Sequence, residues 1–393
     1  MHRCKINSMV ISLTFGGGEI ASFRLIQMLA RFNLLGNLIL IFPRMISSIT
    51  NMRKLKEYLK NLGIQMDENS FIGVYRNKFE FVVLVIKALK FAYKKFDNRS
   101  KVCVMIDTPE LVFPSLFLKI IKPKLKLVII THGTFESALF AFKVKGKFFP
   151  MLYSFVQMLT YKFFMVFFNL RLTFIPNSSS KYIHIPFPIK LNIIQSSTNE
   201  YRNNILYMGR LQQRVKGWLD AVRAYNNFVL NTIYRKSTFT TLTSLPKLII
   251  AGDGPEKYLA LKISNNSNHL IDFIGFVDEP EKTKVLSHTR VLLLPSRHES
   301  FPIIVLEALA SQVVIVTYEE PWIRYLPRKL QKSILTARPY DISDLTAKLE
   351  KAFIYYEQFK PNLRDLNELR NLSDEQQCER ILYYYFKKIC HTS

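Results

Sequence analysis

The sequence predicts an α/β protein with two domains, each built on a parallel β-sheet. Its 393 residues exceed what one hydrophobic core usually holds. Short apolar runs alternate with longer amphipathic stretches, which is typical of βαβ units. The alternation restarts after the polar stretch IKLNIIQSSTNEYRNN at 189–204, whose Asn and Ser content indicates a linker. We therefore expect domains at 1–190 and 191–360, followed by a helical segment at 361–393. One interpretation of this last segment is that it crosses back to the first domain.

The strands that we expect follow this alternation along the chain. In the first half they are MVISL, before the helical stretch EIASFRLIQMLARF, then KVCVMI and KLKLVIITHG. In the second half they are NILYMGR, PKLIIAGDG, HLIDFIGFV, RVLLLPS and VVIVTYE. Residues 342–393 have the pattern of helices.

The overall composition excludes several classes of protein. A hydrophobic content of 49% argues against disorder. Cys4, Cys103, Cys378 and Cys390 form no CxxC pair and no zinc-ligand spacing, so we expect neither a disulfide framework nor a structural metal, and a reducing, cytoplasmic setting. The apolar N-terminal stretch continues into glycines without a cleavage site, which favours a strand over a signal peptide.

Positive charge is concentrated in the first half of the chain. Residues 1–190 contain 28 Lys and Arg against 9 Asp and Glu, a net charge of +19, whereas residues 191–393 contain 27 against 21, a net charge of +6. A basic half suits nucleic acid, an anionic membrane or an acidic substrate, or is a solvated lysine-rich surface. No nucleic-acid-binding motif is present, so nucleic acid is not an expected partner.

The apolar segment 148–170 leaves three alternatives open. It is long enough to raise the question of a membrane span, yet Gln157 and Lys162 interrupt it. The others are a buried helix and a helix lying at the surface of a bilayer. Three lysines precede the segment: Lys143, Lys145 and Lys147. With the +19 charge, the third alternative predicts a peripheral protein whose first half docks on an anionic membrane.

The stretch LLLPSRHESFPIIVLEALASQVVIV at 292–316 has the pattern of a strand, a turn, a helix opened by Pro302 and another strand. The free amides around Ser300 and Phe301, at the positive end of the helix dipole, would bind a phosphate or diphosphate.

Two glutamates flank this predicted phosphate site. Glu299 lies in the turn, and Glu307 lies one to two turns inside the helix, where its carboxylate would reach two vicinal ribose hydroxyls. The spacing of eight residues is weak evidence by itself, because charged residues at such intervals are usually solvated. The apolar strands on both sides make it much stronger.

The segment from Asn204 to Val316 resembles the retaining glycosyltransferases of family 4. The motifs NILYMGRLQQRVKGWLDAV, LIIAGDGPE, IDFIGFV and PSRHESFPIIVLEALA occur in the family's order. The resemblance implies the GT-B fold, in which two Rossmann-like domains face each other across a cleft. It also implies transfer of a sugar, with retention, from a nucleoside diphosphate sugar to a hydroxyl of a glycan or a lipid-linked acceptor. The donor is a co-substrate, and no other cofactor is expected.

The resemblance also implies roles for particular residues. Arg210 and Lys216 would hold the donor diphosphate, whose charge grows as the glycosidic bond breaks. Glu299 would lie beside the donor sugar and Glu307 would hold the ribose. The nucleobase would lie beside Phe276 and Val277. No Asp-x-Asp motif is present, so we expect no metal. Ser300 and Pro302 stand where the family often has glycine.

The first half resembles the family less closely. Gly17 and Gly18, in TFGGGE, would let backbone amides approach the donor phosphates or the acceptor, or they form only a tight turn. His132 follows an apolar strand where the family commonly has a histidine that contacts the transferred sugar, although an isolated histidine is more often structural.

Three other functions remain open at this point. A GT-B epimerase or hydrolase would use the same fold, since fold alone does not settle function. The chain could also be a degenerate glycosyltransferase kept as a scaffold, or a basic binding protein without catalysis.

Overall fold

The computed structural model divides the chain into two compact units. Unit 1 comprises Met1–Phe135, Phe149–Lys190 and Leu372–Ser393, and unit 2 comprises Glu136–Phe148 and Leu191–Asn371. The structure describes residues 6–11, 17–32, 34–43, 60, 70–75, 77–96, 102–106, 112–131, 152, 155, 159, 163, 165–176, 181–189, 191, 202–234 and 245–391. The segment expected as a separate C-terminal piece, 361–393, is thus divided between the units at residue 372.

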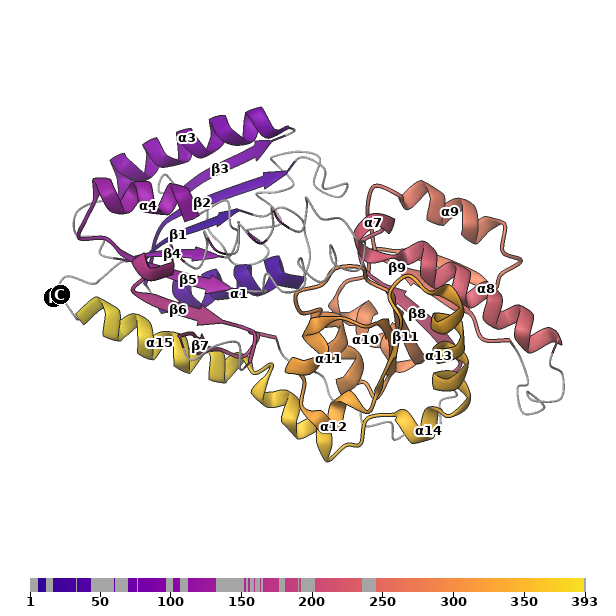
Figure 1. Ribbon diagram of the computed structural model, residues 1–393. Helices are drawn as coiled ribbons and strands as arrows, with labels where there is room; N and C mark the ends of the chain where they lie inside the picture. The colour runs from indigo at the N-terminus through magenta and orange to yellow at the C-terminus, as the bar shows by residue number, and fades with distance from the viewer. Residues whose placement is uncertain are drawn as a thin grey trace. The chain divides into compact units, whose positions relative to one another are not determined.

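Unit 1 contains a seven-stranded parallel sheet in the order β3-β2-β1-β4-β5-β6-β7 (Figure 1). Its strands are β1 (Ile6–Ile11), β2 (Leu35–Pro43), β3 (Ser70–Tyr75), β4 (Val102–Ile106), β5 (Lys126–Thr131), β6 (Leu170–Thr173) and β7 (Ile183–His184). Its helices are α1 (Gly17–Arg31), α3 (Lys78–Lys95), α4 (Val112–Ile121), η2 (Met165–Phe167) and α15 (Glu375–His391).

Helices α3 and α4 pack against this sheet: α3 contacts β3 and β2, and α4 contacts β5. Asn77 caps α3, because its side chain accepts a hydrogen bond from the backbone N–H of Glu80 at 2.9 Å. Ala88 and Ala92 on the inner face of α3 pack with Ile39 and Leu127 of the strands in one buried cluster. The small alanines let the helix approach the sheet closely.

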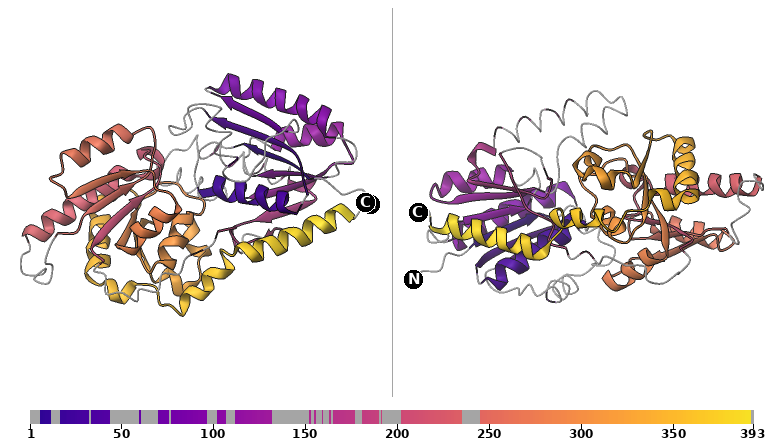
Figure 2. Two further views of the ribbon diagram at one scale, coloured as in Figure 1. Left: turned by 180° about the vertical axis from the view of Figure 1, so that it is seen from behind. Right: turned by 90° about the horizontal axis from the view of Figure 1, so that it is seen from below.

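The last helix, α15, packs on unit 1 although it follows unit 2 in the sequence (Figure 2). The backbone N–H of Phe187 donates to the carbonyl of Leu372 at 2.7 Å, at the point where the chain returns. Further along, Lys126 Nζ donates to the carbonyl of Ile389 at 3.1 Å, and the rings of Phe32 and Tyr383 lie 5.0 Å apart.

Cys390 at the end of α15 is disulfide-bonded, whereas Cys378 is a buried free thiol. The sequence was expected to lack a disulfide framework, and the disulfide at Cys390 is a departure from that expectation.

Unit 2 contains a six-stranded parallel sheet in the order β10-β9-β8-β11-β12-β13. Its strands are β8 (Asn204–Met208), β9 (Leu248–Ala251), β10 (Ile271–Gly275), β11 (Thr289–Leu294), β12 (Val314–Tyr318) and β13 (Ile334–Ala337). After β8 the chain builds the sheet outward through β9 and β10, and then returns to place β11 on the other side of β8. The strand order therefore reverses between β8 and β11.

Helices cover both faces of this sheet. They are α7 (Gln213–Lys216), α8 (Trp218–Tyr234), α9 (Lys257–Asn265), α10 (Glu279–Ser287), α11 (Ile303–Ala310), η3 (Pro321–Tyr325), α12 (Arg328–Gln331), α13 (Ile342–Ile354), α14 (Tyr356–Phe359) and η4 (Asp365–Asn371). Aromatic side chains dominate the core between α8, α13 and the sheet: Trp218, Tyr225, Phe228 and Phe353 are all buried there.

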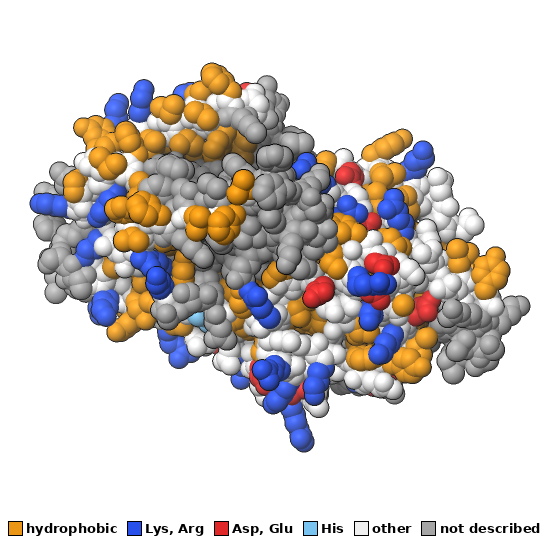
Figure 3. Space-filling view, in the orientation of Figure 1, with side chains coloured by type: hydrophobic (Ala, Val, Ile, Leu, Met, Phe, Trp, Pro, Cys, Tyr) orange, Lys and Arg blue, Asp and Glu red, His pale blue; other side chains and the backbone are white. Residues whose placement is uncertain are grey.

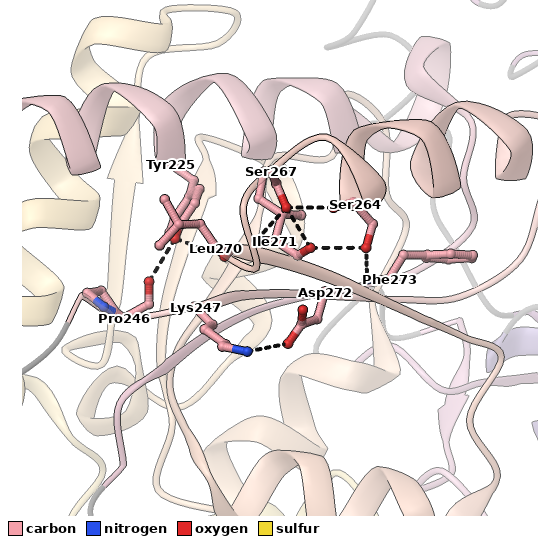
Figure 4. Close-up of polar contacts among 9 residues, drawn as sticks. All are labelled: Tyr225, Pro246, Lys247, Ser264, Ser267, Leu270, Ile271, Asp272 and Phe273. Carbon is pink, nitrogen blue, oxygen red and sulfur yellow. Dashed lines mark hydrogen bonds and ion pairs between the residues drawn. The ribbon is translucent and has the colours of Figure 1, made fainter.

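Polar contacts fix the amino ends of β9 and β10 (Figure 4). The hydroxyl of Tyr225 donates to the carbonyls of Pro246 and Leu270 at 2.7 and 3.0 Å. Ser264 and Ser267, at the end of α9, both donate to the carbonyl of Ile271 at 3.0 Å. These contacts lie at the edge of the sheet where the strands begin. The loops that follow the carboxyl ends of the strands lie at the opposite edge.

Most of the apolar segment 148–170 lies outside the described residues, as do Lys143, Lys145 and Lys147. The four positions described between residues 152 and 163 are Leu152, Phe155, Leu159 and Phe163, and their exposed fractions lie between 43% and 66%. They follow one another at helical spacing. Within the described part of the chain, no helix has both the length and the hydropathy needed to cross a membrane.

Candidate functional site

Three of the predicted site residues lie in loops at the carboxyl edge of the unit 2 sheet. Arg210 follows β8, Lys216 ends the short helix α7 after it, and Glu299 lies in the loop after the neighbouring strand β11. Open parallel sheets bind ligands beyond the carboxyl ends of their strands, at the point where the strand order reverses. In unit 2 that point lies between β8 and β11.

Two glycines allow the loops at this edge to pack backbone against backbone. Gly252 has a φ of +141°, and a Cβ there would lie 1.9 Å from the carbonyl oxygen of Gly209. Gly217 has a φ of +64°, and its Cβ would lie 2.0 Å from the carbonyl oxygen of Pro295. Any side chain would push the loops apart. Gly252 of the AGDGPE motif therefore does more than make a turn, because it places the loop after β9 against the loop that carries Arg210.

Glu256, at the end of the same motif, fixes the orientation of α7. Its Oε2 atom accepts a hydrogen bond from the backbone N–H of Gln213 at 2.9 Å and another from the indole N–H of Trp218. These residues lie on either side of Lys216, so the glutamate positions the lysine without contacting it.

Lys216 and Glu299 form an ion pair inside the site. The Nζ atom of Lys216 bonds Glu299 Oε1, which also accepts from the hydroxyl of Ser296 at 3.1 Å. The side chains are 26% and 13% exposed. Arg210, in the loop after β8, is half-buried, and its guanidinium group forms no ion pair or hydrogen bond with any described residue. The site thus offers one unpaired cation and one that is held by a carboxylate.

A buried carboxylate, Asp220 of α8, ties the loops of the site together. It accepts hydrogen bonds from Gln213 Nε2 at 2.8 Å, from Arg297 Nη2 at 2.8 Å and from the hydroxyl of Tyr318 at 3.2 Å. These three partners belong to α7, the loop after β11 and the end of β12. Burial first, and Asp220 next, raise the pKa of Tyr318, so this phenol stays protonated and donates.

Helix α11 begins after Pro302, as the sequence predicted. No side chain of the described residues caps its first turn. The N–H of Val305 bonds the carbonyl of Pro302 at 3.1 Å, and the N–H groups before it are left available to an anion. Ser300 is half-buried, whereas Phe301 is only 7% exposed and packs edge-on against Trp322 at 6.3 Å. The side chain of Phe301 is therefore part of the core, and only its backbone can contribute to binding.

Glu307 of α11 pairs with Lys282 of α10. Lys282 Nζ lies 2.6 Å from Glu307 Oε1 and 3.0 Å from Glu279 Oε1. Burial acts to lower the pKa of Lys282, but the two carboxylates outweigh it and raise this pKa. A charged ammonium group therefore holds Glu307 in place.

For the remaining predicted residues other than His132, the structure gives a position in the fold but describes no contact with the groups above. Phe276, 72% exposed, and the half-buried Val277 directly follow β10 at the same edge of the unit 2 sheet. Gly17 and Gly18 open helix α1 of unit 1. His132 lies outside the described residues.

Glu320, just after β12, is a site residue that sequence reasoning missed. It is 5% exposed, and it interacts electrostatically with Glu299 and Lys216. Burial and, to a smaller extent, the charge of Glu299 raise the pKa of Glu320 to about 9, although Lys216 acts in the opposite direction. Its place at the carboxyl end of an apolar strand was the signal that could have found it.

The part of the chain that contains these site residues matches a known protein family. Residues 189–361, nearly all of unit 2, match the family "Glycosyl transferases group 1". A stretch of 85 residues is 36% identical to the O-antigen biosynthesis glycosyltransferase WclY of Escherichia coli, and it covers 21% of this chain and 24% of that protein. The chain thus aligns with about a quarter of the length of the curated relative.

Solved structures resemble the whole chain in fold. Sucrose-phosphate synthase from Thermosynechococcus elongatus has a TM-score of 0.70 at 11% identity, covering 99% of this chain and 100% of that one. Anabaena Alr3699/HepE in complex with UDP and glucose has a TM-score of 0.64 at 12% identity, covering 97% and 99%. The predicted α/β fold of the GT-B kind, with a parallel sheet in each unit, is confirmed.

Proposed function

We propose that the protein is a glycosyltransferase that moves a sugar from a nucleoside diphosphate sugar to an acceptor hydroxyl, with retention of anomeric configuration. One observation carries the proposal. Arg210, Lys216, Glu299 and the uncapped start of α11 lie at the edge of the sheet where its strand order reverses, inside the domain that matches the family. The two cations and the start of the helix suit a diphosphate that gains charge as it leaves, and Glu299 lies beside them to accept a hydrogen bond from the sugar.

The ion pair supports a defined role for Lys216. With no donor bound, its charge is balanced by Glu299. A diphosphate brings two or more negative charges, so it would compete for the ammonium group and free Glu299 to accept a hydrogen bond from a sugar hydroxyl. Arg210 would bind the same diphosphate without first giving up a partner.

The other assignments follow from the family resemblance. Glu307, held by Lys282, would bind the ribose, and Phe276 and Val277 would border the base. Gly17, Gly18 and His132 of unit 1 would contact the donor or the transferred sugar. We propose that the cations and helix amides neutralise the diphosphate without a metal, and that the acceptor is a glycan or a lipid-linked saccharide. The UDP bound to Anabaena Alr3699/HepE makes uridine donors the first to test.

The first prediction concerns turnover. The protein should transfer sugar from one of a panel of nucleoside diphosphate sugars to a saccharide acceptor, and the product should keep the donor's anomeric configuration, as measured by NMR. The correct donor at 100 times its Kd should also stabilise the protein by about 2.7 kcal/mol. An inverted product would refute the retaining mechanism, and free or epimerised sugar formed without acceptor would favour a hydrolase or epimerase.

We also propose that unit 1 docks on an anionic membrane, and the described residues offer a surface for it. Helices α3 and α4 expose apolar side chains with exposed fractions between 49% and 78% (Figure 3). This α3–α4 surface consists of Phe79, Val82, Ile86, Tyr93, Phe117 and Ile120. Five exposed lysines flank it: Lys87, Lys90, Lys94, Lys95 and Lys124. Apolar side chains rimmed by lysines are the chemistry that a bilayer with acidic lipids binds.

The second prediction tests this docking surface. Each lysine near an acidic bilayer contributes about 1 kcal/mol, roughly fivefold in partitioning. Replacing Lys87 and Lys90 by Ala should therefore weaken co-sedimentation with anionic liposomes about 30-fold at low salt. The matched pair Lys257→Ala and Lys262→Ala, on α9 of unit 2, should change it little. Equal binding to neutral and anionic vesicles, or none at low salt, would contradict the proposal.

A further inference from the structure

Glu320 is a buried carboxyl group that the proposed chemistry does not use. It follows β12 and precedes η3, and its Oε2 atom is buried and finds no hydrogen-bond partner among the residues that the structure describes. Burying an ionised carboxylate without full hydrogen bonding is costly, whereas the neutral acid is tolerated far better. The surroundings of Glu320 therefore favour the protonated form.

The neighbours of Glu320 belong to the proposed donor site. The backbone N–H of Glu299 faces its carboxyl group, and the side chains of Glu299 and Lys216 both act on it. Tyr340, from the turn after β13, is the further titratable group that interacts with it, and burial raises the pKa of this phenol. On the segment of Glu320 itself, Glu319 and Arg324 are exposed.

We propose that Glu320 is a positioning residue of the donor site, which must be protonated for the diphosphate to bind Lys216. As a neutral acid it supports the Glu299 loop and leaves Lys216 with a single carboxylate partner. If it ionised, two carboxylates would share this lysine, holding it more tightly and repelling the incoming diphosphate. Glu320 thus sets an upper pH limit for donor binding. The inference rests on the proposed function, because it assigns the diphosphate to Lys216.

The test is the pH dependence of nucleoside diphosphate binding, measured by calorimetry with UDP and the other common nucleoside diphosphates. A group with a pKa of about 9 that must stay protonated weakens binding roughly fourfold between pH 7.5 and 9.5. In Glu320→Gln, which keeps a neutral side chain of the same shape, this roughly fourfold component should be absent, so the Kd for a given nucleoside diphosphate should rise less with pH than in the wild type. Glu319→Gln, which removes the adjacent exposed carboxylate, should keep the wild-type profile.

A second readout needs no ligand. The pKa of Glu320 is higher in the folded than in the unfolded protein, so the native state binds the extra proton and loses stability as pH rises from about 4.5 toward 9. The midpoint of thermal unfolding should therefore fall less steeply with pH in Glu320→Gln than in the wild type. Identical binding profiles for the two proteins would overturn the positioning role while leaving the donor site intact. Failure of the wild type to bind any nucleoside diphosphate would overturn both.

Discussion

Replacing Lys216 by Ala should lower kcat/KM for the donor roughly ten- to a hundredfold, because losing a charged hydrogen-bonding partner costs about 1.5–3 kcal/mol. The loss should be larger in kcat than in ground-state binding, since the diphosphate carries its greatest charge in the transition state. Steady-state kinetics with the cognate donor, at saturating acceptor, would measure both effects.

Two further variants separate loss of the cation from damage to the loop. Lys216→Ala leaves Glu299 unpaired beside Glu320, which by itself disturbs the site. Adding Glu299→Gln removes that unpaired charge, so thermal stability should recover while activity does not. Lys262→Ala removes an exposed positive charge from the last turn of α9 and should keep wild-type kinetics. If folded Lys216→Ala keeps wild-type kcat/KM, the diphosphate binds elsewhere.

The sequence predicted best the parts of the fold that depend on local pattern. Five strands of unit 2, β8 to β12, occur where apolar runs of strand length were recognised, and Pro302 does mark the start of α11. Strands β2 and β3 of unit 1, its short strands β6 and β7, and the edge strand β13 of unit 2 were missed. β6 adjoins the apolar segment 148–170, so no change of pattern marks its start. A short strand contains too few residues to show a recognisable alternation of apolar and polar side chains.

The site was predicted as a set of residues but not as a set of contacts. Lys216 and Glu299 were both assigned to the donor, yet their ion pair joins positions 83 residues apart. No role was predicted for Lys282 or Asp220. Lys282 matters because it pairs with Glu307, and Asp220 because it pairs with Arg297, and both pairs form only in the folded protein. The side chain of Phe301 could not be assigned to the core before its contact with Trp322 was known.

Replacing Asp220 by Ala should destabilise unit 2 by about 3–5 kcal/mol, because it leaves Arg297 and two neutral donors without their acceptor in a buried setting. For a unit of this size the midpoint of thermal unfolding should fall by roughly 6–20 °C. Arg297→Met in the same chain should recover part of the loss, since it removes the uncompensated charge. The matched control is Asp272→Ala, whose carboxylate pairs with Lys247 at 3.0 Å on the surface and should contribute less than about 1 kcal/mol. Equal midpoints for the Asp220 and Asp272 variants would show that Asp220 does not hold the loops of the site together.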